Sequence, residues 1–137
     1  MTTNSINITK CDNQLIIIAV NNDNTNETVE ICNIKSGNNN SVDVTIDIVE
    51  STSPTNETIT LDGLQQDLSG IYTVTVPAGN YSLIYSGINW GGPYNFEFTF
   101  NGETHKLIND TAKPLNGAIW NLGNLDLTFK VAEAATV

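Results

Sequence analysis

The residues able to do chemistry are few in this chain. His105 is its only histidine, so any Ser-His-Asp or Cys-His catalyst must be built around it. His105 lies in a predicted strand just after a turn, where its side chain faces a rim or solvent. The sequence contains no strained turn that would bring a nucleophile to it. Asp43 and Asp47 lie about 13 Å apart along one strand, beyond the roughly 5 to 9.5 Å that glycosidases use. We therefore expect a protein that is not an enzyme.

Candidate metal ligands are equally sparse. Cys11 and Cys32 are the only cysteines, and with one histidine they cannot fill a closed zinc site without carboxylate help. Two buried free thiols are the expected state, and a disulfide joining adjacent strands is the alternative. Residues 21–27 offer oxygen ligands at alternate positions, as calcium prefers, but lack the glycine and aspartate run of an EF-hand. We expect an asparagine-rich turn there, no metal ion and no cofactor.

A tryptophan and a tyrosine flank a Gly-Gly-Pro break in an otherwise strand-dense region. Asn89, Trp90 and Tyr94 surround this break. Exposed loop aromatics with an amide beside them stack on sugar faces in lectins and form hot spots at protein interfaces. These three residues are therefore our candidate contact site for a partner or a glycan. The alternative is that Trp90 folds back and plugs one end of the fold, whereas Trp120 is expected in the core.

Charge excludes two classes of partner. The net charge of -10 comes from 15 acidic residues against 5 lysines, with no arginine. Phosphate backbones are held mainly by lysine and arginine, so we expect no nucleic-acid partner. An acidic surface also disfavours anionic membranes, and the longest apolar run, residues 15–20, is too short to cross a bilayer. No basic residue precedes Ile6, so we expect no secretory signal and synthesis in a cytosol.

One alternating segment predicts a half-buried strand. Its apolar residues alternate with polar ones and are Val42, Val44, Ile46 and Ile48. A period of two sends these side chains to the core and the carboxylates of Asp43 and Asp47 to solvent. Comparable patterns indicate further strands, not all of which we expect to form. The candidates are 5–9, 14–20, 28–34, 41–49, 57–61, 70–76, 81–85, 94–100, 103–108, 117–120 and 125–131.

Turn chemistry between these segments favours one all-β domain. Asn101-Gly102, between two alternating runs, is the clearest hairpin signal. Helical periodicity is almost absent, and residues 61–68 are the best place for a single helical turn. A chain of 137 residues matches one domain. We predict an antiparallel β-sandwich, immunoglobulin-like or jelly-roll, over residues 1–137. The ends, 1–4 and 132–137, are predicted to be flexible arms that order only on a partner.

One segment resembles a known family of viral proteins. It runs from Leu68 to Val76, through Pro77-Ala78-Gly79-Asn80, and on from Tyr81 to Tyr85. This strand-turn-strand motif, interpreted as a hairpin, resembles one that recurs in small virion proteins of tailed bacteriophages. The resemblance implies a capsid-associated or neck-associated β-sandwich, similar to the Ig-like decoration proteins of phage heads.

That likeness implies a non-enzymatic structural protein, a capsid decoration or auxiliary protein that docks on the phage head and stabilises it or binds surfaces. Its partners would be the major capsid protein or other virion proteins, and it would be made in the host cytoplasm and reside in the virion. A homo-oligomer, such as a trimer matching local capsid symmetry, would close exposed sheet edges. The alternative function is a carbohydrate-binding module, in which Trp90 and Tyr94 form the platform and Asn89 supplies polar contacts.

Overall fold

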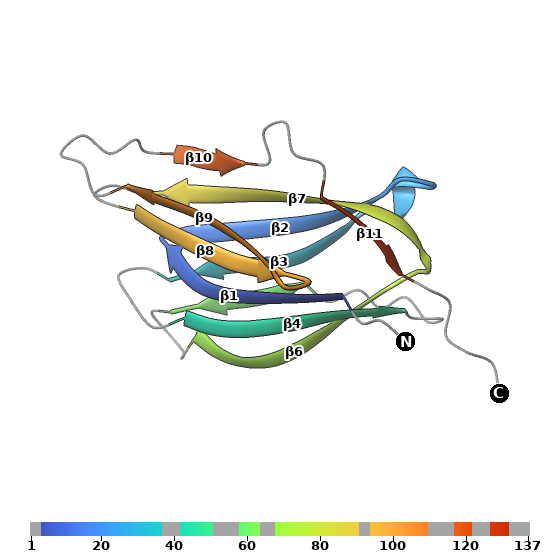
Figure 1. Ribbon diagram of the computed structural model, residues 1–137, viewed down its shortest axis with the longest axis horizontal. Helices are drawn as coiled ribbons and strands as arrows, with labels where there is room; N and C mark the ends of the chain where they lie inside the picture. Colours follow the sequence, from blue (N-terminus) through green and yellow to red (C-terminus); the bar gives the residue numbers. More distant parts are fainter. Residues whose placement is uncertain are drawn as a thin grey trace.

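Two β-sheets form the fold of the computed structural model, which describes residues 4–36, 42–50, 58–63, 68–90, 94–109, 117–121 and 127–131. Sheet A contains, in spatial order, β6 (Leu68–Val76), β4 (Val42–Glu50), β1 (Asn4–Asp12), β8 (Tyr94–Phe100) and β9 (Glu103–Asn109). Sheet B contains β10 (Gly117–Asn121), β7 (Gly79–Asn89), β2 (Gln14–Asn21), β3 (Val29–Lys35) and β5 (Ile59–Asp62). A further strand, β11 (Leu127–Val131), also pairs with β7. Most of the long strands run along the long axis of the molecule (Figure 1).

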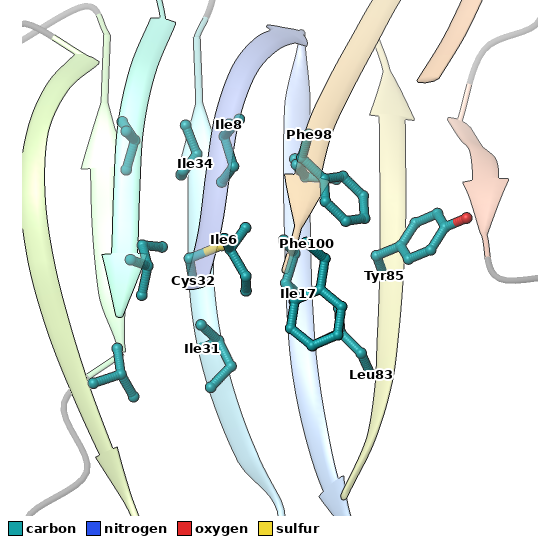
Figure 2. Close-up of a cluster of buried hydrophobic side chains, with 14 of the residues drawn as sticks. Ile6, Ile8, Ile17, Ile31, Cys32, Ile34, Leu83, Tyr85, Phe98 and Phe100 are labelled. Carbon is teal, nitrogen blue, oxygen red and sulfur yellow. The ribbon is translucent and has the colours of Figure 1, made fainter. Parts of the chain in front are cut away.

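One apolar core lies between the sheets, and this confirms the predicted all-β sandwich. Ile6, Ile8, Phe98 and Phe100 enter it from sheet A, and Ile17, Ile31, Cys32, Ile34, Leu83 and Tyr85 enter it from sheet B (Figure 2). The alternation in β4 behaves as predicted, because its four aliphatic side chains from Val42 to Ile48 are buried while Asp43 is exposed. Burial of such side chains, each contributing about 1.5 to 3 kcal/mol when fully buried, is the main stabilising term.

Every predicted strand is present, so the expectation that some would not form is wrong. Strand β7 is longer than predicted and continues from Tyr85 to Asn89. Asn4 is not part of a loose arm, because it begins β1, pairs with Ile48, and donates a side-chain hydrogen bond to the Lys130 carbonyl. The remaining arm positions, 1–3 and 132–137, lie outside the described residues.

The single helical turn lies elsewhere than predicted. Leu61 belongs to β5 and Leu68 to β6, and residues 64–67 between them lie outside the described part of the chain. A short 3-10 turn, η1 (Thr25–Glu27), occurs instead in the asparagine-rich loop after β2. Asparagine side chains that bond to nearby backbone amides favour such tight turns.

Two strand pairs are parallel, within sheets whose other pairs are antiparallel, as the sequence predicts. Strand β3 pairs with β5, and β4 pairs with β6, each in parallel register. Parallel neighbours need a long crossover connection, which is usually a helix. Here the crossover is a strand of the other sheet: β4 of sheet A links β3 to β5, and β5 of sheet B links β4 to β6. These two parallel pairs were not predicted, because only helices were considered as crossovers.

The motif at residues 68–85, which resembles phage virion proteins, does not form a hairpin. Its two strands, β6 and β7, are separated by only Pro77 and Ala78, yet β6 lies in sheet A and β7 in sheet B. The chain therefore arches from one layer to the other at this point. Proline has no backbone N–H to contribute to a ladder and suits such a connection.

Two β-bulges bring both cysteines into the core. The β1–β8 register shifts between Ile8 and Lys10, so that Cys11 faces inward opposite Phe96. The β2–β3 register shifts between Ile17 and Ile18, and as a result the neighbours Ile31 and Cys32 are both buried. An extra residue on one strand resets the alternation beyond it. The cysteines lie on opposite sheets as buried free thiols, as the sequence predicts.

The hairpin predicted at Asn101-Gly102 is confirmed and joins β8 to β9. Asn101 has φ 49° and Gly102 has φ 86°, the left-handed pair that a tight hairpin turn requires. The Asn101 side chain accepts a hydrogen bond from the Ser5 amide at 2.8 Å and donates one to Asn4 Oδ1 at 2.9 Å. The turn is therefore also tied to the start of β1.

We expect Gly102→Ala to lower the free energy of unfolding by about 1 to 2 kcal/mol, because an L side chain is strained at this φ. A Cβ at Gly102 would meet no atom of the described residues within 4 Å, so we expect no contribution from a steric clash. Gly102→Asn is the matched control, since asparagine tolerates the left-handed region. Urea denaturation measures both variants, and equal losses would show that φ does not govern this site.

Candidate docking surface

The polar residues considered for catalysis do not converge. His105 is half-buried at the rim of the core, where its ring lies 5.3 Å from that of Phe98, and its Nε2 has no hydrogen-bond partner among the residues that the structure describes. Asp43 and Asp47 lie on the outer face of sheet A, whereas His105 is opposite Phe98 on the inner side. Among the described residues, no three histidine, cysteine or acidic side chains are grouped so as to hold a metal ion.

In the loop considered for calcium, side-chain oxygens accept hydrogen bonds from other groups of the protein. Asn21 Oδ1 accepts hydrogen bonds from the amides of Asp23 and Asn24 at 2.9 and 3.0 Å. Asp23 Oδ2 accepts from the backbone and side-chain nitrogens of Asn80, and Glu27 Oε2 accepts from Asn21 Nδ2. These bonds fix the loop against the start of β7. They describe the asparagine-rich turn that the sequence predicts.

The buried thiols are poorly placed for nucleophilic chemistry. Burial raises the pKa of the Cys32 thiol far above its ordinary value of 9.0, and the nearby Cys11 adds to this rise. The Cys11 Sγ lies 3.3 Å from the Ile34 carbonyl oxygen and donates to it. Since the thiolate is the reactive form, Cys32 acts as a small apolar side chain in the core.

Trp90 is the exposed member of the predicted contact site, and its backbone and ring are both anchored. About half of the residue is accessible, 49%. Its amide donates to Asn13 Oδ1 at 2.8 Å, and its indole Nε1 donates to Gln14 Oε1 at 3.4 Å. Gln14 in turn donates through Nε2 to Asn33 Oδ1 at 2.9 Å, so both ends of its amide are used. Trp90 therefore does not plug the end of the sandwich.

Asn89 and Tyr94 do not share that exposure. Asn89 is buried at the end of β7, and Tyr94 is buried at the start of β8, with its ring 6.1 Å from that of Phe96. The Gly-Gly-Pro break between them, residues 91–93, lies outside the described residues. Of the three predicted contact residues, Trp90 is thus the one whose side chain a partner can reach directly.

An aliphatic surface continues from Trp90 over the outer side of sheet B. In β2 and β7 the alternate residues Leu15, Ile17, Ala19, Leu83 and Tyr85 face the core. The residues between them point away from the core, and the apolar ones are Ile16, Ile18, Val20, Ile84 and Ile88. Register places Ile18 opposite Ile84 and Gln14 opposite Ile88. We call these five side chains together with Trp90 the aliphatic face.

Charged residues border the aliphatic face on one side. Glu30 of β3 lies opposite Ile18, and Lys35 of β3 lies opposite Gln14. Ile84 is 41% exposed and the other four aliphatic side chains are half-buried. An apolar centre with a polar rim is typical of protein–protein contact surfaces.

Sequence reasoning missed this face although a signal was present. The run Leu15 to Val20 is apolar at every position, which is typical of a strand buried on both sides. The predicted strand over residues 14–20 includes this run, but its second apolar side was not predicted to be a contact surface. In the described part of the chain, no helix is long and apolar enough to cross a membrane.

Comparison with known proteins identifies no relative. No protein-family model matches the chain, and neither a curated protein nor a solved structure matches it. The fold and the surface by themselves place the described residues in a two-sheet β-sandwich with an aliphatic outer face on sheet B.

The raised pKa of the Cys32 thiol predicts how the stability of the protein changes at alkaline pH. We expect the free energy of unfolding to fall above pH 9.0, the ordinary thiol pKa. There the unfolded chain releases the Cys32 proton while the folded chain keeps it, a slope of about 1.4 kcal/mol per pH unit. Below that pH both states hold the proton, so Cys32 contributes no slope. Urea denaturation at about pH 8 and about pH 10 measures the difference.

Cys32→Ala is the matched variant for this measurement. Burial also raises the pKa values of Tyr81 and Tyr85, and both tyrosines remain in the variant. The variant will be less stable overall, because it leaves a small cavity, but its stability should fall less between the two pH values. An identical fall in both proteins would contradict the assignment to Cys32.

Proposed function

We propose that the protein is a virion structural component, a decoration or auxiliary protein that docks on the capsid of a tailed phage through its aliphatic face. The proposed partner is the major capsid protein or another virion protein. The observation that carries the docking role is the aliphatic face itself, with the anchored Trp90 at its end and Ile84 exposed on β7. The virion assignment is supported by the likeness of residues 68–85 to phage virion proteins.

Surface chemistry supports a contact made by this face in preference to the opposite one. The outer side of sheet A carries Asp43 and Asp47, and Asn7 donates to both Asp43 Oδ1 and Thr45 Oγ1. Such a face is well solvated, so removing it from water is costly. Removing the aliphatic face from water is instead favourable, because burying apolar area contributes about 25 cal/mol per Å². An aromatic such as Trp90 is the side chain most enriched at interface hot spots.

Mass spectrometry of phage particles tests this proposal. Particles produced by the host that carries this gene should contain peptides of the chain in many copies. Ile84→Lys should reduce its particle content at least tenfold, because a buried contact would then hold an unpaired charge, a cost of about 1.4 kcal/mol or more. Thr104→Lys, which places the same charge on exposed β9, is the matched control and should leave particle content unchanged. Particles free of the wild-type chain would refute the proposal.

A second function, carbohydrate binding, is favoured by one specific observation. The Trp90 indole is exposed and its orientation is set by the hydrogen bond from Nε1 to Gln14. A fixed, accessible aromatic ring is the stacking platform that sugar-binding sites use. Asn89 and Tyr94, which we expected to contribute to such a site, are buried at the end of β7 and the start of β8.

Glycan-array binding distinguishes this alternative from the first proposal. If sugars bind here, Trp90→Ala should abolish binding, while Trp90→Phe should retain part of it because the ring face remains. Gln14→Ala should weaken binding less than Trp90→Ala, since it frees the ring without removing it. Wild-type protein that binds no glycan would contradict the carbohydrate role and leave capsid docking unaffected.

A further inference from the structure

Strand β6 is an edge of sheet A that lacks the features by which proteins protect such edges. It pairs with β4 on one side, and no described strand pairs with its other side (Figure 1). Four of its residues are exposed to solvent, namely Ser69, Gly70, Ile71 and Thr73, and the exposed fraction of Ile71 is 78%. Edge strands are usually kept short, charged, interrupted by proline or covered, because their free backbone groups invite another strand.

The other edges in the described part of the fold differ from β6. Strand β9 carries Glu103 and Lys106, and β5 has only four residues, one of them Asp62. The outer side of β7 is occupied in two parts by β10 and β11, and each of these edge strands has only five residues. Strand β6 has nine residues, Leu68–Val76, with no charge and no proline. It is the long edge with high β-propensity, through Ile71, Thr73 and the valines.

We propose that β6 pairs antiparallel with β6 of a second copy of this chain, across a twofold axis perpendicular to sheet A. This pairing gives the expected homo-oligomer a defined contact, and it holds independently of capsid docking or glycan binding. In a register centred on Tyr72, Ile71 of one copy lies opposite Thr73 of the other on the outer face. Pairs of β-branched residues in this arrangement stabilise a sheet by about 0.2 to 1 kcal/mol each.

The absence of charged residues makes β6 the long edge at which two copies of this chain can meet. Two chains of net charge -10 repel each other, so any contact between them must avoid carboxylates. Across the proposed junction, β4 of one copy is three strand spacings from β4 of the other, about 14 Å. That separation exceeds the Debye length of about 8 Å at physiological salt, so the Asp43 and Asp47 carboxylates of the two copies are largely screened. The nine uncharged residues span about 30 Å of backbone.

Sedimentation and light scattering over a wide concentration range test the pairing. Wild-type protein should have twice the chain mass of 14.8 kDa. The double variant Ile71→Lys/Thr73→Lys should raise the dimer dissociation constant at least tenfold, because the new lysines face each other across the twofold axis. The control Thr28→Lys/Thr104→Lys carries the same added charge on exposed positions away from β6 and should remain dimeric.

Hydrogen exchange of the wild-type protein provides a readout that needs no variant. Amides in 68–76 should be protected more strongly at high than at low protein concentration, while those of the β9 edge should not change. Circular dichroism checks that each variant is folded before its mass is interpreted. A monomer at all concentrations, a trimer, or a β6 double variant that dimerises like wild type would each overturn the proposal.

Discussion

The constraint on which the whole fold depends is that its two sheets can only form together. From β3 to β8 the chain changes sheet at every connection, so consecutive strands lie in different layers. Among the described strands, β2–β3 and β8–β9 are the sequence neighbours that also pair. Most hydrogen-bonded pairs therefore join distant segments, and their loop-closure entropy is offset only when the shared core is buried. The sandwich consequently behaves as one cooperative unit.

Local chemistry allowed the elements of this fold to be predicted, but not their partners. The period-two alternation of β4 and the left-handed turn at Asn101-Gly102 are encoded within a few residues. The parallel pairing of β4 with β6 is not encoded locally, since it depends on which layer the intervening β5 joins. Nor are the bulges, such as the one that buries Ile31 beside Cys32, because a bulge is defined by the opposite strand.

The candidate site was predictable only in part, for a similar reason. An exposed Trp90 follows from its place beside a Gly-Gly-Pro break, whereas burial of Tyr94 follows from its phase with Phe96 and Phe98 in the next strand. That phase was already visible in the sequence and would have separated the two aromatics. The anchoring of Trp90 by Gln14 was not visible, because β2 and the end of β7 meet only through sheet B pairing.

The two proposed contacts reinforce each other geometrically. A twofold axis perpendicular to sheet A keeps the inner face of one copy in line with the inner face of the other, so both copies of sheet B lie on the same side. The aliphatic faces of the two copies, on β2 and β7, then point in the same direction. A pair joined at β6 would present two docking surfaces to one target, and the second contact forms at high effective concentration once the first is made. Each face can then be individually weak, which suits aliphatic side chains that are only half-buried.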